Sequence, residues 1–242
     1  MSRLGVLLGC AAFIACGGQG VISLKYVAAS GGSLALRPPS ASNPGSVVAS
    51  LSWPVPTGMS DGEVRGCEVL GKKLRVTLNG VAPVASRGVV GSSSPDSCPQ
   101  PSFTFSMATL GSVTDAELIL SDDMATLRLV ARNALIVRTL TRIGDFAQAK
   151  PGAQLEHAWL PTTDSPILGS GGFTYPDQTL VKFEVRHESD LLVFDLPAAP
   201  WSAGTSVNFG ASAFAPVDTC DGGIACQVLL DPLHDDFALP AL

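Results

Sequence analysis

The sequence predicts an all-β protein, an antiparallel β-sandwich that forms either one domain or two small sandwich units. Short runs in which apolar and polar residues alternate recur along the 242-residue chain, and this period of two is typical of strands with one buried face. Gly and Pro number 25 and 18, while charged residues make up only 15%. This composition favours strands and turns over exposed helices.

Alternation and turn residues place the individual strands. We expect strands near residues 22–26, 74–78, 103–105 and 181–185. Turns are predicted at 61–62, 79–80, 122–123 and 188–190, the last forming a hairpin. Residues 124–143 fit a helix or a pair of strands, and we favour strands. The Ser-, Gly- and Pro-rich segment 85–101 predicts a long surface loop.

Two distant segments have similar sequences. Residues 46–70 align with residues 206–229 with one deletion, and the segments upstream of them, 26–36 and 185–196, share a pattern of strand, Ser-containing turn and apolar run. These similarities suggest a diverged duplication of one β unit. The units would span residues 21–145 and 146–242 and meet near 144–152. Chance similarity in a chain rich in Ser, Gly and Val is the alternative, and one continuous domain over 21–242 would then follow.

The amino terminus has the pattern of an export signal. Arg3 precedes an apolar run over residues 4–15, which ends in Cys16 and glycines. The run is too short to span a membrane as a helix. It resembles the lipobox signal of bacterial lipoproteins, in which an invariant cysteine becomes the acylated first residue; residues 7–10 also fit the box but leave too short an apolar run. The resemblance implies a signal peptide over 1–15, a lipid on Cys16 and a tether over 16–20. An ordinary secretory signal with incidental cysteines is the alternative.

The remaining cysteines predict disulfides. Four cysteines are left once the amino-terminal pair is set aside, an even number in a chain that we expect to be exported. Of the three possible pairings, we choose Cys67–Cys98 and Cys220–Cys226, because each pair is nearest in sequence. The first pair would hold the 85–101 loop. The paired short spacings of a zinc site do not occur.

The catalytic motifs considered are either incomplete in this sequence or absent from it. Residues 66–73 resemble a phosphate-binding loop but lack the Ser or Thr after its lysine, and the following residues alternate like a strand. There is no G-x-S-x-G elbow and no close histidine pair. We therefore expect no cofactor and no buried constellation of nucleophile, base and orienting acid, with four polar residues mainly at the solvated surface: Glu156, Asp164, Glu184 and His187.

A few residues could still bind a ligand. Trp53, Trp159 and Trp201 could stack on a sugar if they are exposed, although tryptophans in a sandwich more often pack in the core. A divalent metal could find ligands in two clusters, which are His234-Asp235-Asp236 and the pair Asp218 and Asp221. Consecutive strand residues point to opposite faces, however, which argues against the first cluster.

These observations predict an exported, lipid-anchored protein of the cell envelope that acts as a non-catalytic binding or scaffold module. In enterobacterial lipoproteins, whose signal this segment resembles, an aspartate after the acylated cysteine can direct retention in the inner membrane. No aspartate follows Cys16, so the resemblance implies the outer membrane, facing the periplasm or the cell surface. Partners would be the membrane, through the lipid, and a protein or glycan. The net charge of −6 and the lack of a basic run argue against nucleic acid. The alternatives are an extracytoplasmic hydrolase with an acid-based site and a structural subunit of an envelope complex.

Overall fold

Strands dominate the protein, and the predicted all-β sandwich class is confirmed. The computed structural model describes residues 21–54, 69–70, 73–87, 101–162, 167–188 and 190–240. The predicted leader, Cys16, the Cys67–Cys98 pair, Asp164 and the 61–62 turn lie outside these residues.

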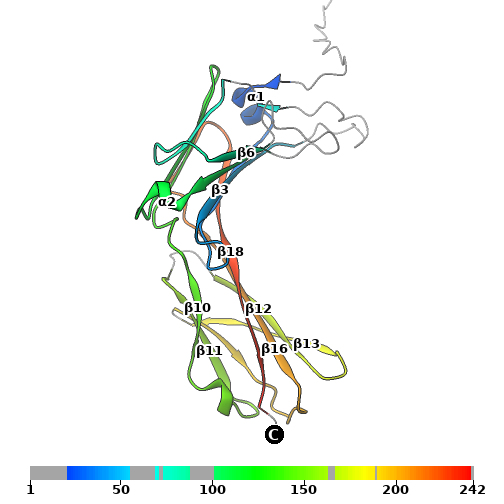
Figure 1. Ribbon diagram of the computed structural model, residues 1–242. Coiled ribbons are helices and arrows are strands. Elements are labelled where there is room, and N and C mark those ends of the chain that lie inside the picture. Colours follow the sequence, from blue (N-terminus) through cyan, green and yellow to red (C-terminus); the bar gives the residue numbers. More distant parts are fainter. Residues whose placement is uncertain are drawn as a thin grey trace, which may run out of the picture.

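One eight-stranded sheet runs the length of the molecule, in the order β13-β12-β16-β18-β2-β3-β7-β6. Its strands are β2 (Ser33–Arg37), β3 (Ser46–Ser52), β6 (Ala85–Arg87), β7 (Ser102–Ser106), β12 (Ile167–Thr174), β13 (Leu180–Phe183), β16 (Ser206–Ala215) and β18 (Ala225–Ala238). Because β18 continues from one end to the other, this sheet joins two lobes that lie end to end (Figure 1).

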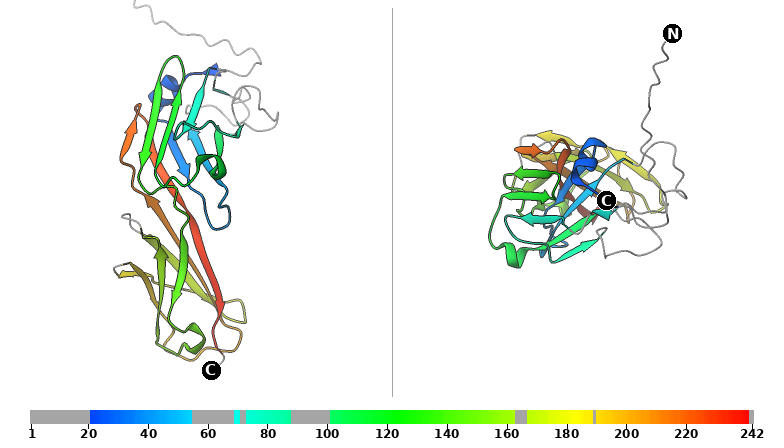
Figure 2. Two further views of the ribbon diagram at one scale, coloured as in Figure 1. Left: turned by 60° about the vertical axis from the view of Figure 1, so that its left-hand side comes forward. Right: turned by 90° about the horizontal axis from the view of Figure 1, so that it is seen from above.

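Each lobe has its own second sheet (Figure 2). In the first lobe the order is β17-β9-β8-β5, and in the second it is β10-β11-β15-β14. These strands are β5 (Arg75–Leu78), β8 (Ala116–Ser121), β9 (Thr126–Ala131), β10 (Thr139–Ile143), β11 (Gln154–Leu160), β14 (Arg186–Glu188), β15 (Leu191–Asp195) and β17 (Thr219–Asp221). The smaller elements are β1 (Val21–Ile22), which pairs with β4 (Val69–Leu70), together with α1 (Leu24–Ala29), α2 (Met107–Leu110) and the 3-10 helix η1 (Phe146–Gln148).

Alternation along the strands fills the core. In β3 every second residue is buried, and Val47, Ala49 and Leu51 are fully enclosed. Removing such apolar area from water contributes about 25 cal/mol per Å². The buried residues of both lobes form one connected cluster, so the core continues through the junction between the lobes.

Each lobe contains segments from both sides of residue 145, so the lobes do not correspond to the predicted units 21–145 and 146–242. Strand β10 already pairs with β11 in the second lobe. Farther along, β17 pairs with β9 of the first lobe, and the start of β18 pairs with β2. The chain thus returns to its first lobe near its end.

The predicted duplication does not correspond to equivalent strands. Strands β2 and β3 are neighbours in one sheet. Their counterparts in the sequence alignment, β15 and β16, lie in different sheets. The similarity between residues 46–70 and 206–229 therefore gives no equivalent pairing of strands.

The first predicted strand is a helix instead. Ser23 caps α1 by accepting a hydrogen bond from the Tyr26 backbone N–H at 3.3 Å. Leu24 and Val27, three residues apart, face the core. The Asp122 carboxylate also accepts from the Leu24 backbone N–H at 2.7 Å, so a distant residue helps to fix the start of this helix.

The remaining local predictions concern residues 124–143, two turns and the segment 85–101. Residues 124–143 contain the strands β9 and β10, as favoured, and the 122–123 turn joins β8 to β9. Strands β14 and β15 pair antiparallel with Glu188 opposite Leu191, which confirms the predicted hairpin. Residues 85–87 correct the predicted loop, because they form β6 and pair with β7.

Candidate functional site

A hollow with a mixed polar and apolar lining lies on the exposed face of the second lobe, over β12, β13, β16 and β18. Its apolar lining residues are Leu180, Phe183, Val185 and Phe209. We call it the trough, and its volume is about 600 Å³. Its polar side chains come from four strands or strand ends and carry both signs of charge: Ser170, Lys182, Glu184, Asn208, His234 and Asp236.

Glycines in the strand register make the trough. Gly172 lies between Asn208 and Lys182 on the neighbouring strands, and Gly210 lies opposite His234. A Cβ on Gly210 would come within 3.1 Å of the His234 ring. Because glycine has no side chain, the sheet surface is depressed at these positions, and polar side chains stand around the depression.

A short hydrogen-bonded row crosses the trough. The Thr174 hydroxyl donates to Asn208 Oδ1 at 2.9 Å, and Asn208 Nδ2 donates to Asp236 Oδ1 at 3.1 Å. These bonds orient the Asn208 amide and the Asp236 carboxylate. The surface can therefore offer several fixed donors and acceptors to a polar ligand.

Directly beneath the trough lies a second polar group, which we call the inner cluster: Arg142, His157 and Asp235. Asp235 stands between His234 and Asp236 on β18 and points to the opposite face, into the lobe. Its carboxylate accepts a hydrogen bond from His157 Nε2 at 2.7 Å. It also accepts two from Arg142, from Nε at 2.6 Å and from a terminal nitrogen at 2.5 Å.

Aromatic rings enclose the histidine. The His157 ring is fully buried and stacks on Phe209, with 4.4 Å between ring centroids. Phe146 meets it edge-on at 5.1 Å. The Arg142 guanidinium lies over Phe237, 4.6 Å from the ring centroid. The inner cluster therefore links β10 and β11 of one sheet to β16 and β18 of the other.

The environment sets the charges of the inner cluster. Desolvation by burial lowers the pKa of His157 below its usual 6.5, although the hydrogen bond to Asp235 opposes this shift. Desolvation acts to raise the pKa of Asp235, but the hydrogen bonds from Arg142 and His157 hold it below 3.8. A neutral imidazole thus donates Nε2–H to a carboxylate near neutral pH.

A buried histidine and a carboxylate do meet in the inner cluster, whereas the sequence-based expectation concerned a set of nucleophile, base and orienting acid. However, the His157 side chain has no exposed surface, so it cannot touch a substrate in this conformation. Its Nδ1 has no hydrogen-bond partner among the described residues. The geometry is that of a structural link between two sheets, and general-base catalysis needs contact with the reacting group.

The proposed metal ligands are not brought together. Strand alternation separates Asp235 from His234 and Asp236. In the first lobe, Asp218 accepts hydrogen bonds from the backbone N–H and Nε of Arg132, both at 2.9 Å. Within the described part of the chain, no group of three His, Cys, Asp or Glu residues could hold a metal ion.

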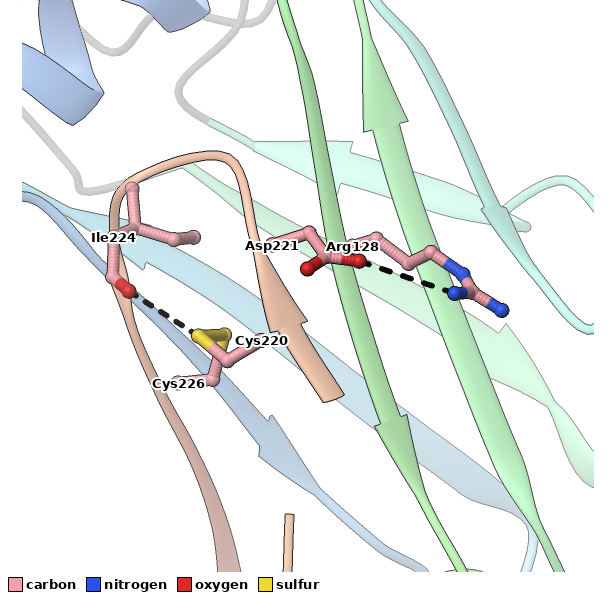
Figure 3. The surroundings of a disulfide bond; sticks show 5 residues. All are labelled: Arg128, Cys220, Asp221, Ile224 and Cys226. Carbon is pink, nitrogen blue, oxygen red and sulfur yellow. Dashed lines mark hydrogen bonds and ion pairs between the residues drawn. A yellow bond between two sulfur atoms is a disulfide. The ribbon is translucent and has the colours of Figure 1, made fainter. Parts of the chain in front are cut away.

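The predicted Cys220–Cys226 disulfide is confirmed. It joins the middle of β17 to the start of β18, as Figure 3 shows. Beside it, Asp221 lies 3.9 Å from a terminal nitrogen of Arg128 on β9. The bond therefore braces the point at which the chain returns to the first lobe.

The tryptophans do not form a stacking surface. Trp159 is fully buried and Trp201 is 4% exposed, so the ligand-stacking interpretation is wrong for both. The Trp201 Nε1–H donates to the Pro240 carbonyl at 2.8 Å. Trp53 is half-buried and packs against the core.

The polar residues named from sequence are not members of the inner cluster. Glu184 and His187 are exposed, and Glu156 is half-buried. Sequence reasoning missed Arg142 and His157 as a pair. The sequence did contain one indication, because His157 alternates with the apolar residues Leu155 and Trp159 and so lies on the buried face of this strand.

Comparisons with known proteins add little. No protein-family model matches the chain, and the comparison with curated proteins finds no match either. Among solved structures, a chimeric titin Z1Z2 functionalized with a KLER exogenous peptide from decorin matches 81% of this chain and 93% of that chain. The sequence identity is 14% and the TM-score 0.20, a likeness that carries no argument. In the described residues, no helix is long and apolar enough to cross a membrane.

Proposed function

We propose that the chain is an exported, lipid-anchored envelope protein that binds a partner without catalysing a reaction. The trough carries this proposal, because it is an open hollow on one sheet face of the second lobe and presents polar side chains of both charges. The partner is a protein or glycan segment rich in hydrogen-bonding groups. The disulfide supports export, since such bonds persist in oxidising compartments.

Two physical features suit the trough to binding. All of its polar groups except Glu184 sit on strands rather than on loops, so little conformational entropy is lost when a ligand orders them. Lys182 and Asp236 offer opposite charges on the two sides of Gly172 and Asn208, a pattern that favours a partner with both donors and acceptors. Strand positions also keep the spacing of these groups constant.

Capture from solubilised cell envelope tests the binding proposal. The full-length chain is immobilised, and the bound components are compared with those of the double variant Lys182→Gln, Asp236→Asn. This variant removes one charge of each sign and leaves the net charge unchanged. We expect at least a tenfold loss of the specifically bound component, which corresponds to about 1.4 kcal/mol.

A matched control exists in the first lobe. Lys73 and Asp123 form an exposed ion pair beside another open hollow. The double variant Lys73→Gln, Asp123→Asn makes the same change in charge far from the trough and should leave capture unchanged. If both variants capture as the wild type does, the trough is not the binding surface.

The anchor is tested separately. The lipoprotein proposal expects the native protein in the membrane fraction with a mass that places an acylated Cys16 at its amino terminus. Cys16→Ser should release the chain or leave its signal uncut. An unmodified cysteine, or a mature start at another residue, would exclude lipid attachment at Cys16.

A further inference from the structure

A small cavity lies at the junction between the two lobes. Its volume is about 10 Å³. The walls come from the loop after β2, the connection between β9 and β10, strand β11 and the middle of β18: Pro38, Pro39, Ser40, Ile136, Arg138, Trp159, Leu230, Asp231 and Leu233. Segments of both lobes therefore meet at one point.

Two buried N–H donors belong to this wall. Arg138 is 5% exposed, and its terminal nitrogens donate to the carbonyls of Ile136 at 3.1 Å and Asn133 at 3.0 Å. Its Nε has no partner among the described residues, and the same holds for Nε1 of the fully buried Trp159. Buried donors without a partner are rare in folded proteins because they lose their hydrogen bonds to water.

We propose that this cavity binds one internal water molecule, held by Arg138 Nε–H and Trp159 Nε1–H. The water oxygen accepts both hydrogen bonds. The wall residues Asp231 and Ser40 offer acceptors for its two hydrogens. The Ser40 hydroxyl already accepts from the Asn43 backbone N–H at 3.1 Å and shares a hydrogen bond with Ser42 at 3.0 Å, so the Asp231 carboxylate is the main acceptor. The volume matches a single water, which needs roughly 10–15 Å³ and two to four polar partners.

The chemistry of the wall favours water over an anion. A chloride ion could accept from the two N–H groups, but it has no hydrogen to donate to the Asp231 carboxylate. Like charges in a site of low polarity repel each other strongly. Water satisfies both kinds of group and places no second negative charge beside the carboxylate.

The water bridges the two lobes and so restrains their relative orientation. Trp159 belongs to a sheet of the second lobe, whereas Ser40 follows a strand of the first. This role goes beyond partner binding and does not depend on the trough.

Oxygen-17 relaxation dispersion of water counts long-lived internal waters in the full-length protein. Trp159→Phe removes one donor and keeps an aromatic ring, so we expect the loss of one long-lived water. Trp201→Phe is the matched control, because the Trp201 N–H bonds directly to a carbonyl. It should keep the wild-type count.

A crystal structure of the unsubstituted protein provides a test that needs no variant. We expect a water oxygen within hydrogen-bonding distance of both nitrogens. A direct protein partner at either nitrogen, a density that refines as chloride, or an equal water count in wild type and Trp159→Phe would overturn the proposal.

Discussion

Replacing Asp235 by Asn should destabilise the second lobe, because the inner cluster depends on the carboxylate. An amide oxygen cannot accept both hydrogen bonds from Arg142 and the bond from His157, and the new amide N–H groups face donors. Losing the buried bond to His157 costs about 1–2 kcal/mol. The Arg142 side chain is 41% exposed, so water replaces part of its ion pair, and we assign that loss only about 0.5–1 kcal/mol.

The total is a loss of about 1.5–3 kcal/mol in the free energy of unfolding. For a chain of this size, that corresponds to a fall in Tm of roughly 3–12 °C. Denaturant and thermal unfolding, followed by tryptophan fluorescence, measure it. The control is Asp236→Asn on the same strand, whose exposed side chain should change stability by no more than about 0.5 kcal/mol. Equal effects of the two substitutions would refute the role assigned to the inner cluster.

Three further predictions concern the second lobe and the disulfide. Burial lowers the pKa of His157 in the folded state, so as the pH falls the unfolded chain is protonated at this residue before the folded chain is. The free energy of unfolding should therefore fall as the pH drops below 6.5. His157→Phe should flatten this part of the curve of unfolding free energy against pH, and an unchanged slope would contradict the assignment. A Cβ on Gly171 would lie 2.4 Å from the Phe183 ring and 2.5 Å from a backbone oxygen. Gly171→Ala should therefore lower the free energy of unfolding by about 1–3 kcal/mol, as measured by denaturant unfolding. The control Gly45→Ala, whose Cβ would have nothing within 4 Å, should leave it nearly unchanged. Replacing both Cys220 and Cys226 by Ser removes a loop with a sequence separation of 6 and should lower the unfolding free energy by about 2 kcal/mol in the chain-entropy model; an unchanged denaturation midpoint would show that the bond does not constrain the unfolded chain.

Local patterns in the sequence determined much of the strand content. The alternation at 103–105 and the choice of strands over a helix at 124–143 were confirmed, because burial of one strand face imposes a period of two. The Cys220–Cys226 bond was also predictable, since the two residues are close along the chain. The α1 segment shows the limit of this reasoning, because its apolar spacing fits either period and its start is fixed by Asp122, 98 residues away.

Tertiary structure alone decided how the strands pair and which polar residues meet. Arg142 and Asp235 are 93 residues apart in sequence, and His157 and Asp235 are 78 apart. Their contact requires β10 and β11 in one sheet to face β18 in the other, and strand periodicity carries no information about that pairing. The same holds for the trough, since Gly172 and Gly210 make a hollow only when the register sets them among Lys182, Asn208 and His234. Sequence determines which face of a strand a side chain occupies, and the packing of the sheets determines what that side chain meets there.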